Sequence, residues 1–178
     1  MARRGIAVAA IVLGLFAGAL PAHAAGTTTT FSLVAGSLSI SAPASKSLGS
    51  GATGGGTVSA QLGTVTVTDG RGTLLGSWTS SVSSTDFTTG GATTDETIAK
   101  AAATYWSGPA TASTGVGTFT PGQATSGNAQ DLSASRTAFS ASVLVGNNSA
   151  SWNPTVTITV PASAVAGTYS GTITHSVA

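Results

Sequence analysis

The chain has no cysteine, few charged side chains and only two histidines among its 178 residues. Without cysteine it forms neither a disulfide nor a thiolate nucleophile. Beyond residue 24 the single histidine is His175, which excludes a metal site built from several histidine or cysteine ligands. Catalysis needs acids and bases that lie together and are tuned to one another, and here they are sparse. We therefore expect no enzymatic activity, no catalytic residues and no cofactor.

Charge of either sign is also scarce. The whole chain carries six basic and five acidic side chains, and four and five of these lie beyond residue 24. Binding to phosphates rests on several Lys or Arg contacts, and a polybasic segment is what holds a protein at an anionic membrane surface. The near-neutral balance excludes both modes, so we expect no nucleic-acid partner.

The amino terminus has the three parts of a secretory signal peptide. Arg3 and Arg4 precede an apolar stretch over residues 5–20, which Pro21 ends, and Ala22-His23-Ala24 is a small-x-small cleavage site. The apolar stretch is shorter than the roughly 20 residues that span a bilayer. We predict a signal peptide over residues 1–24, no membrane span after cleavage, and a secreted protein located at the extracellular cell surface.

Serine and threonine are what the chain has in abundance, 55 of the 154 residues from position 25 onward. Thr64 to Thr68 and Thr155 to Val160 alternate strictly between threonine and an apolar residue, a period typical of half-buried strands. Glycine-rich turns separate these runs. The sequence predicts an all-β fold over residues 25–178, a single antiparallel β-sandwich of the immunoglobulin-like or Greek-key type with at most one short helix. Candidate strands are 29–34, 37–41, 57–62, 64–68, 74–83, 139–145, 155–160 and 168–177.

One segment departs from this strand pattern. Thr93 and Glu96 have the spacing of a capping box before an alanine-rich run. We expect one or two helical turns between residues 95 and 103.

Two stretches resemble WxL domain surface proteins of Gram-positive bacteria. Residues 63–72, followed by Gly76-Ser77-Trp78, are similar to that family's first signature, and residues 167–177 to its closing strand. Both name-giving motifs are altered, with Thr79 and Ser80 after Trp78, and His175 and Val177 in place of the second Trp and Leu. The resemblance implies a surface protein held non-covalently on the cell wall, together with membrane-anchored partner proteins.

The three tryptophans are the first candidate binding residues. An indole can stack on a sugar ring while its N–H bonds a hydroxyl, but in a thin core it is more often the largest filler. We favour the core for Trp78, Trp106 and Trp152. Trp152 precedes Asn153-Pro154, where a loop enters a strand, so we expect it to be the most exposed of the three.

Arg71 and His175 complete the candidate binding residues. Arg71 either pairs with Asp69 across a turn or presents its charge to an anionic polymer or partner, and we favour the pairing. His175 lies on the same strand face as Tyr169, Ile173 and Val177. We expect a partly buried imidazole with its hydrogen bonds satisfied, and a ligand-binding or pH-sensing role is the alternative.

Three classes of function follow from these observations. We favour a secreted, non-enzymatic surface protein bound to cell-wall polymer, such as peptidoglycan or an associated glycan, or to a membrane-anchored partner protein. The alternative is a soluble carbohydrate-binding module, which requires aromatic rings exposed on one platform. A hydrolase would need two carboxylates about 5–9 Å apart, and no spacing in the sequence suggests such a pair.

Overall fold

The computed structural model describes residues 26–178, and the expected signal peptide over residues 1–24 lies outside the described residues. Val34–Ala178 forms one compact unit. Residues 26–33 have no regular secondary structure and belong to the preceding unit. No helix within residues 26–178 has both the length and the apolar character required to cross a membrane.

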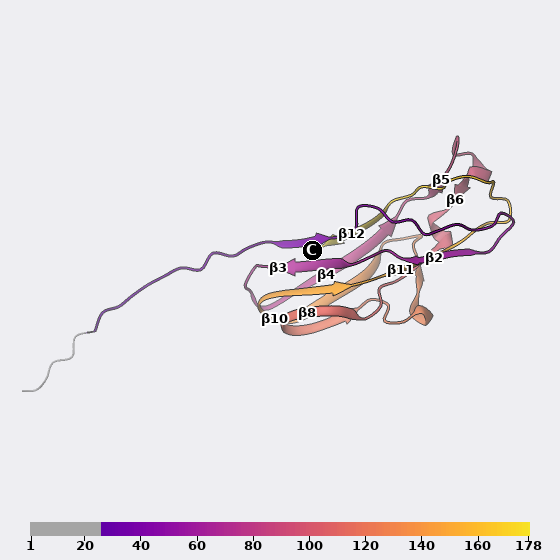
Figure 1. The fold of residues 1–178 in the computed structure, drawn as a ribbon. Helices are drawn as coiled ribbons and strands as arrows, with labels where there is room; N and C mark the ends of the chain where they lie inside the picture. Colours follow the sequence, from indigo (N-terminus) through magenta and orange to yellow (C-terminus); the bar gives the residue numbers. More distant parts are fainter. Residues whose placement is uncertain (1–25) are drawn as a thin grey trace, which may run out of the picture. The chain divides into compact units, whose positions relative to one another are not determined.

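The compact unit is built almost entirely of antiparallel strands (Figure 1). Three sheets form, with strand orders β1-β3-β10-β4-β12, β2-β11-β7-β9 and β5-β6, and β8 pairs with β10 beside the first path. The strands are β1 (Leu38–Ser41), β2 (Thr57–Gln61), β3 (Val65–Asp69), β4 (Leu74–Ser84), β5 (Phe87–Thr88), β6 (Thr97–Ile98), β7 (Ala103–Trp106), β8 (Ala110–Pro121), β9 (Gln130–Asp131), β10 (Arg136–Trp152), β11 (Thr155–Thr159) and β12 (Ile173–Val177).

The long strand β10 organises the fold because it bends back on itself. Its residues 136–145 pair with β4, its residues 148–152 pair with β3, and β8 follows the opposite edge. Both pairings shift register between Ala141 and Val145, where Val143 has a φ of 54°. Phe139 and Trp152 consequently stack, with ring centroids 4.8 Å apart. The two halves of β10 therefore lie in opposite layers of a sandwich.

One layer of the sandwich is lengthened because some of its strands run on directly into the next strand along the chain. β2 leads into β3, β7 into β8, and β10 into β11, and each of these runs keeps its antiparallel partner across the junction. At one junction Leu62 N–H donates to the Pro154 carbonyl at 2.8 Å, which keeps the two runs together. The four-stranded sheet and one half of the larger sheet thus form one long surface.

The core between the layers is small and rich in aromatic rings. The ring centroids of Trp78 and Phe139 are 6.4 Å apart, and Phe139 also stacks on Trp152. These three large rings occupy the centre of the core. Burial of a large apolar side chain contributes about 1.5–3 kcal/mol, which makes these few residues decisive. The largest fully buried apolar side chains are Trp78, Trp152, Tyr105, Phe139, Leu132, Leu144, Val65, Val67, Val82 and Val156.

The all-β, antiparallel, sandwich-like prediction is confirmed, with differences in detail. The strand predicted over residues 29–34 was wrong, and the strand predicted to begin at 168 begins at Ile173. Between residues 95 and 103 the chain forms two single 3-10 turns, Thr94–Glu96 with its capping box and Lys100–Ala102, separated by β6. A third 3-10 turn spans Ser126–Asn128.

The terminal strand β12 gives the first testable prediction. Ile173 is half-buried against the core, while its neighbour Thr174 is exposed. Ile173→Ala should lower the free energy of unfolding by about 1–2 kcal/mol, at or below the range for a fully buried isoleucine. Thr174→Ala on the same strand is the matched control and should have little effect. Urea denaturation of both variants measures the difference, and equal stabilities would contradict the packing of β12.

Candidate functional site

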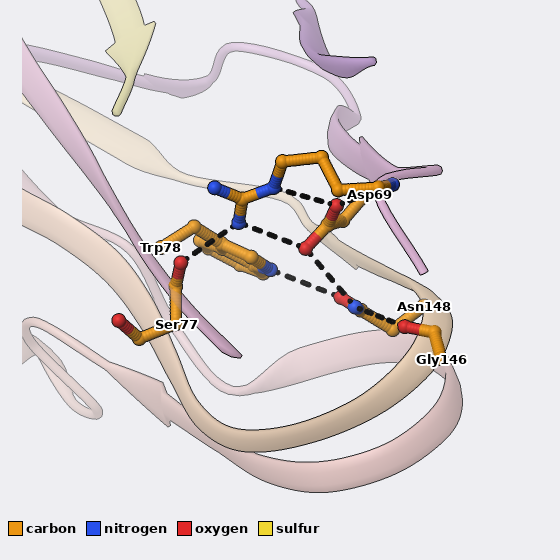
Figure 2. Close-up of polar contacts among 6 residues, drawn as sticks. Asp69, Ser77, Trp78, Gly146 and Asn148 are labelled. Atoms are coloured by element: carbon orange, nitrogen blue, oxygen red, sulfur yellow. Dashed lines mark hydrogen bonds and ion pairs between the residues drawn. The ribbon is translucent and has the colours of Figure 1, made fainter. Parts of the chain in front are cut away.

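Arg71 lies at the turn between β3 and β4, where it forms part of a network of polar side chains (Figure 2). Its guanidinium donates to both carboxylate oxygens of Asp69, each at 2.9 Å, and to the Ser77 carbonyl at 2.8 Å. The Arg71 backbone N–H donates to the same carboxylate at 3.0 Å. These contacts connect the last residue of β3 to the beginning of β4 across the turn.

The buried part of this network includes Trp78 and Asn148. The indole N–H of Trp78 donates to the Asn148 side-chain oxygen at 3.0 Å, and the Asn148 amide donates to Asp69 at 3.2 Å (Figure 2). The hydrogen bond from the Arg71 side chain is the main reason why the pKa of Asp69 is lowered to about 2; burial opposes the shift. Each buried polar side chain of this network has a hydrogen-bond partner, and a protein core accommodates buried polar groups only when they are paired.

Arg71 and Trp78 therefore both take part in the hydrogen bonding that joins β3, β4 and β10. The predicted pairing of Arg71 with Asp69 is confirmed. Trp78 is 1 % exposed, so its ring faces cannot stack on a ligand without opening the core. Asn148, which joins the two, was not singled out in the sequence. Its position in a Gly-Asn-Asn turn signal gave no indication that it is buried.

A cavity lies elsewhere, as an open cleft of about 810 Å³. Its walls are two long irregular loops, residues 42–53 between β1 and β2, and residues 164–172 between β11 and β12. Irregular loops of this length in a compact fold are often functional. Apolar side chains line the inner surface: Val58, Leu62, Val65, Phe87, Ile98, Ile158, Val160 and Ile173.

The second loop is held firmly against the hairpin β5-β6. The Tyr169 hydroxyl lies 3.1 Å from the Asp95 carbonyl and 3.0 Å from the Val165 carbonyl, and Ser170 exchanges backbone hydrogen bonds with Thr88. In the first loop the Gly49 N–H bonds the nearby Ser47 hydroxyl at 3.2 Å, and Leu48 packs against the core. One wall of the cleft is thus fixed through another element, and the other rests on side-chain packing.

His175 lies on the floor of the cleft and joins it to the core. Its Nε2 is 3.1 Å from the Tyr105 hydroxyl, which accepts a hydrogen bond from the Trp152 indole N–H at 3.2 Å. All three groups are satisfied when Tyr105 donates to an unprotonated Nε2. Burial lowers the pKa of His175 from 6.5 to about 4, so the imidazole is neutral at pH 7. The expected partly buried imidazole is confirmed, and its Nε2 is hydrogen-bonded.

The expectation that Trp152 is the most exposed tryptophan was wrong. It is fully buried, whereas Trp106 is half-buried. The reason is that Asn153-Pro154 joins two strands of the same surface without forming a loop. The Asn153 side chain accepts from Gly63 N–H at 3.0 Å and donates to Gln61 at 3.1 Å, which keeps the backbone at the edge of the core.

Carboxylates do not gather anywhere in the part of the chain that the structure describes. Asp69 pairs with Arg71, Asp131 with Arg136, and Asp86 accepts from a backbone N–H. No group of three or more His, Cys, Asp or Glu side chains among residues 26–178 has the arrangement to hold a metal ion. The cleft itself is lined by one charged residue, Lys46, and by no carboxylate. Its lining therefore offers a ligand apolar side chains, backbone groups and hydroxyls, and one charged group.

The cleft was not predicted from the sequence. Its loops contain the turn residues Gly, Pro and Ser, which indicated irregular structure but not that two of these loops face each other. Of the candidate binding residues, only His175 lies in the cleft, and Trp78, Trp152 and Arg71 do not line it. Comparison of the chain with protein-family models, with curated proteins and with solved structures finds no match.

The Asp69 network gives a second prediction. Asp69→Ala leaves the buried Asn148 amide with only its long, 3.5 Å contact to the Gly146 carbonyl and removes the carboxylate partner of Arg71, so the free energy of unfolding should fall by about 2–4 kcal/mol. The control is Asp131→Ala, which removes the more exposed ion pair with Arg136 and should cost much less. Equal losses in urea denaturation would contradict a structural role for the buried network.

His175 gives a third prediction, on pH. Because its pKa is about 4 when folded and 6.5 otherwise, the unfolded chain binds a proton between these values and the folded chain does not. The contribution of His175 to the free energy of unfolding is therefore complete above pH 6.5, and the free energy of unfolding should decrease by roughly 3 kcal/mol as the pH falls to 4. In His175→Gln this decrease should be absent. Denaturation at pH 7 and at pH 4.5 measures it, and an equal slope in both proteins would rule out this assignment.

Proposed function

We propose that the protein is a secreted, non-enzymatic cell-surface protein that binds non-covalently to cell-wall polymer or to a membrane-anchored partner protein, and that the cleft is its binding site. The observation that carries the proposal is the composition of the cleft. It is open, apolar at its floor, rich in backbone and hydroxyl groups at its rim, and lined by no carboxylate. Pockets of this kind bind by shape and hydrogen bonds.

The distribution of titratable groups supports a binding role over a catalytic one. His175 is the only histidine among the cleft residues, its pKa of about 4 makes it a weak base at neutral pH, and the Tyr105 hydroxyl already bonds its Nε2. The described residues that line the cleft beside His175 include no aspartate or glutamate. General acid–base catalysis requires two such groups in reach of one substrate.

The positions of the indoles favour a partner protein over a sugar ligand. A carbohydrate-binding platform needs aromatic faces on the surface, and Trp78 and Trp152 are both buried while Trp106 is half-buried. The cleft instead offers aliphatic side chains between two loops, which suits the alternate side chains of an extended polypeptide. The alternative of a soluble carbohydrate-binding module therefore has less support than binding to a partner.

A fourth prediction tests the cleft as the binding site. Leu48→Glu places a charge between the loops and should abolish retention of the purified protein by cell-wall preparations or by membrane extracts of the source cells. Thr159→Glu is the matched control, because Thr159 lies on the outer face of β11, whose Ile158 lines the cleft. Retention should decrease little between low and physiological salt, since the cleft is nearly uncharged.

Three results would contradict the proposal. The first is that neither preparation retains the parent protein. The second is that Leu48→Glu and Thr159→Glu bind equally well while both remain folded by circular dichroism. The third is a strong loss of binding at physiological salt, which would indicate a charged surface instead of the cleft.

A further inference from the structure

We propose that residues 28–34 of one copy of this chain add as an extra strand to the free edge of β8 in a second copy. This inference goes beyond the proposed function, since it concerns self-association and involves a different surface. The acceptor is the outer edge of β8, and the donor is the segment that precedes β1.

The acceptor is a long strand edge without a partner within the described chain. β8 pairs with β10 along one edge only, from Ala110 to Pro121. Nearly all of its residues are exposed, and none is charged. Natural edge strands usually carry charges, prolines or covering loops that prevent pairing with another chain. This edge has a single proline, at its end, and no charge, and its register against β10 shifts on either side of Val116.

A row of exposed apolar side chains runs up to this edge. Val145 of β10 is in register with Leu74 of β4 on one side and with Val116 of β8 on the other. Leu74 is 77 % exposed and Val116 is 65 % exposed. Side chains opposite one another on adjacent strands interact directly. No strand of residues 34–178 occupies the next position in this row, beside Val116.

The backbone beside the row is held in an unfavourable conformation. Leu75 has a φ of 57° and Val143 a φ of 54°, and both side chains are exposed. A left-handed conformation is a genuine outlier for a β-branched residue such as valine. Such strain is associated with functional surfaces. Here it keeps two further apolar side chains at the solvent side of the bend.

The donor segment has the pattern of a strand but forms none. Phe31 and Leu33, two residues apart, fall on one face of an extended chain, and they are 87 % and 89 % exposed. The neighbouring threonines favour strands, and residues 26–37 contain no charge. The donor, residues 28–34, is seven residues long and would cover part of the twelve-residue edge of β8. Strand addition would give the segment main-chain partners and would place Phe31 or Leu33 beside Val116.

The chain after the donor is anchored, which sets the possible assemblies. Gly36 N–H donates to the Gly70 carbonyl at 2.8 Å, so the segment leaves the compact unit at the turn between β3 and β4. Two copies that exchange segments reciprocally form a closed dimer. One-way donation produces a chain of copies instead. Both assemblies require an intact segment and an intact edge.

Cysteine cross-linking tests the contact directly, because the chain has no cysteine of its own. The full mature protein carrying Leu33→Cys is mixed with one carrying Val116→Cys under mild oxidation, and a disulfide-linked dimer should form between them. The matched pair is Leu33→Cys with Val165→Cys, since Val165 is exposed on the rim of the cleft. This pair should give little product.

Variants of the donor segment and of the β8 edge test whether self-association depends on both of them. The parent protein should elute with the mass of a dimer or larger assembly in light scattering, and Phe31→Asp with Leu33→Asp should be monomeric. Thr30→Asp with Ser32→Asp places the same charges on the other face of the segment and should self-associate. Val116→Asp should also be monomeric. When it is mixed with the Phe31→Asp, Leu33→Asp protein, a dimer should form, because the first variant still has an intact donor segment and the second an intact β8 edge.

Several results would overturn the proposal. A parent protein that is monomeric at every concentration excludes it. Self-association that survives Phe31→Asp with Leu33→Asp would indicate pairing between two β8 edges. A Leu33–Val165 cross-link would place the segment in the cleft. Binding of the monomeric parent to neutral lipid vesicles, lost in Val116→Asp, would make the apolar row a membrane contact. Wall or partner retention is measured separately with Leu48→Glu, so the two proposals can fail independently.

Discussion

The ring of Phe139 lies against the indole of Trp152, although the two residues stand near opposite ends of one strand. This contact requires β10 to turn back on itself, and the rest of the fold follows from that turn. Because β3, β4 and β8 all pair with β10, each must change direction or end where β10 does. A chain with few large apolar residues thereby places its aromatic rings in one small core.

The turn exposes polar groups that the network around Asp69 satisfies. At the end of β3, the Asp69 carboxylate accepts hydrogen bonds from Arg71 and Asn148. The Asn148 side-chain oxygen in turn accepts a hydrogen bond from the Trp78 indole N–H. The charged network at the turn and the aromatic core are therefore parts of one arrangement. The cleft lies apart from this network, between the loops over residues 42–53 and 164–172.

The strands that the sequence predicted are those with one buried and one exposed face. Val65 and Val67 alternate with threonines in β3, and Val156 and Ile158 do the same in β11. β8 was missed because it is exposed on both faces, so no alternation marks it. The segment around Phe31 was predicted as a strand because local pattern does not report whether a partner strand exists. The cleft and the burial of Trp152 depend on loop positions and on the continuity of β10 into β11, which are tertiary properties.

The position of β10 in the sequence also governs when this protein can fold. Its partners β3, β4 and β8 precede it along the chain, and until residues 136–152 are present none of them has the neighbour that completes its sheet. Pairing between distant segments is slow, because loop closure has to occur before any contact stabilises the chain. An emerging chain therefore has no local route to a stable core. It stays unfolded until most of its length has been made, and in that period its uncharged, strand-forming segments are the ones most exposed to aggregation.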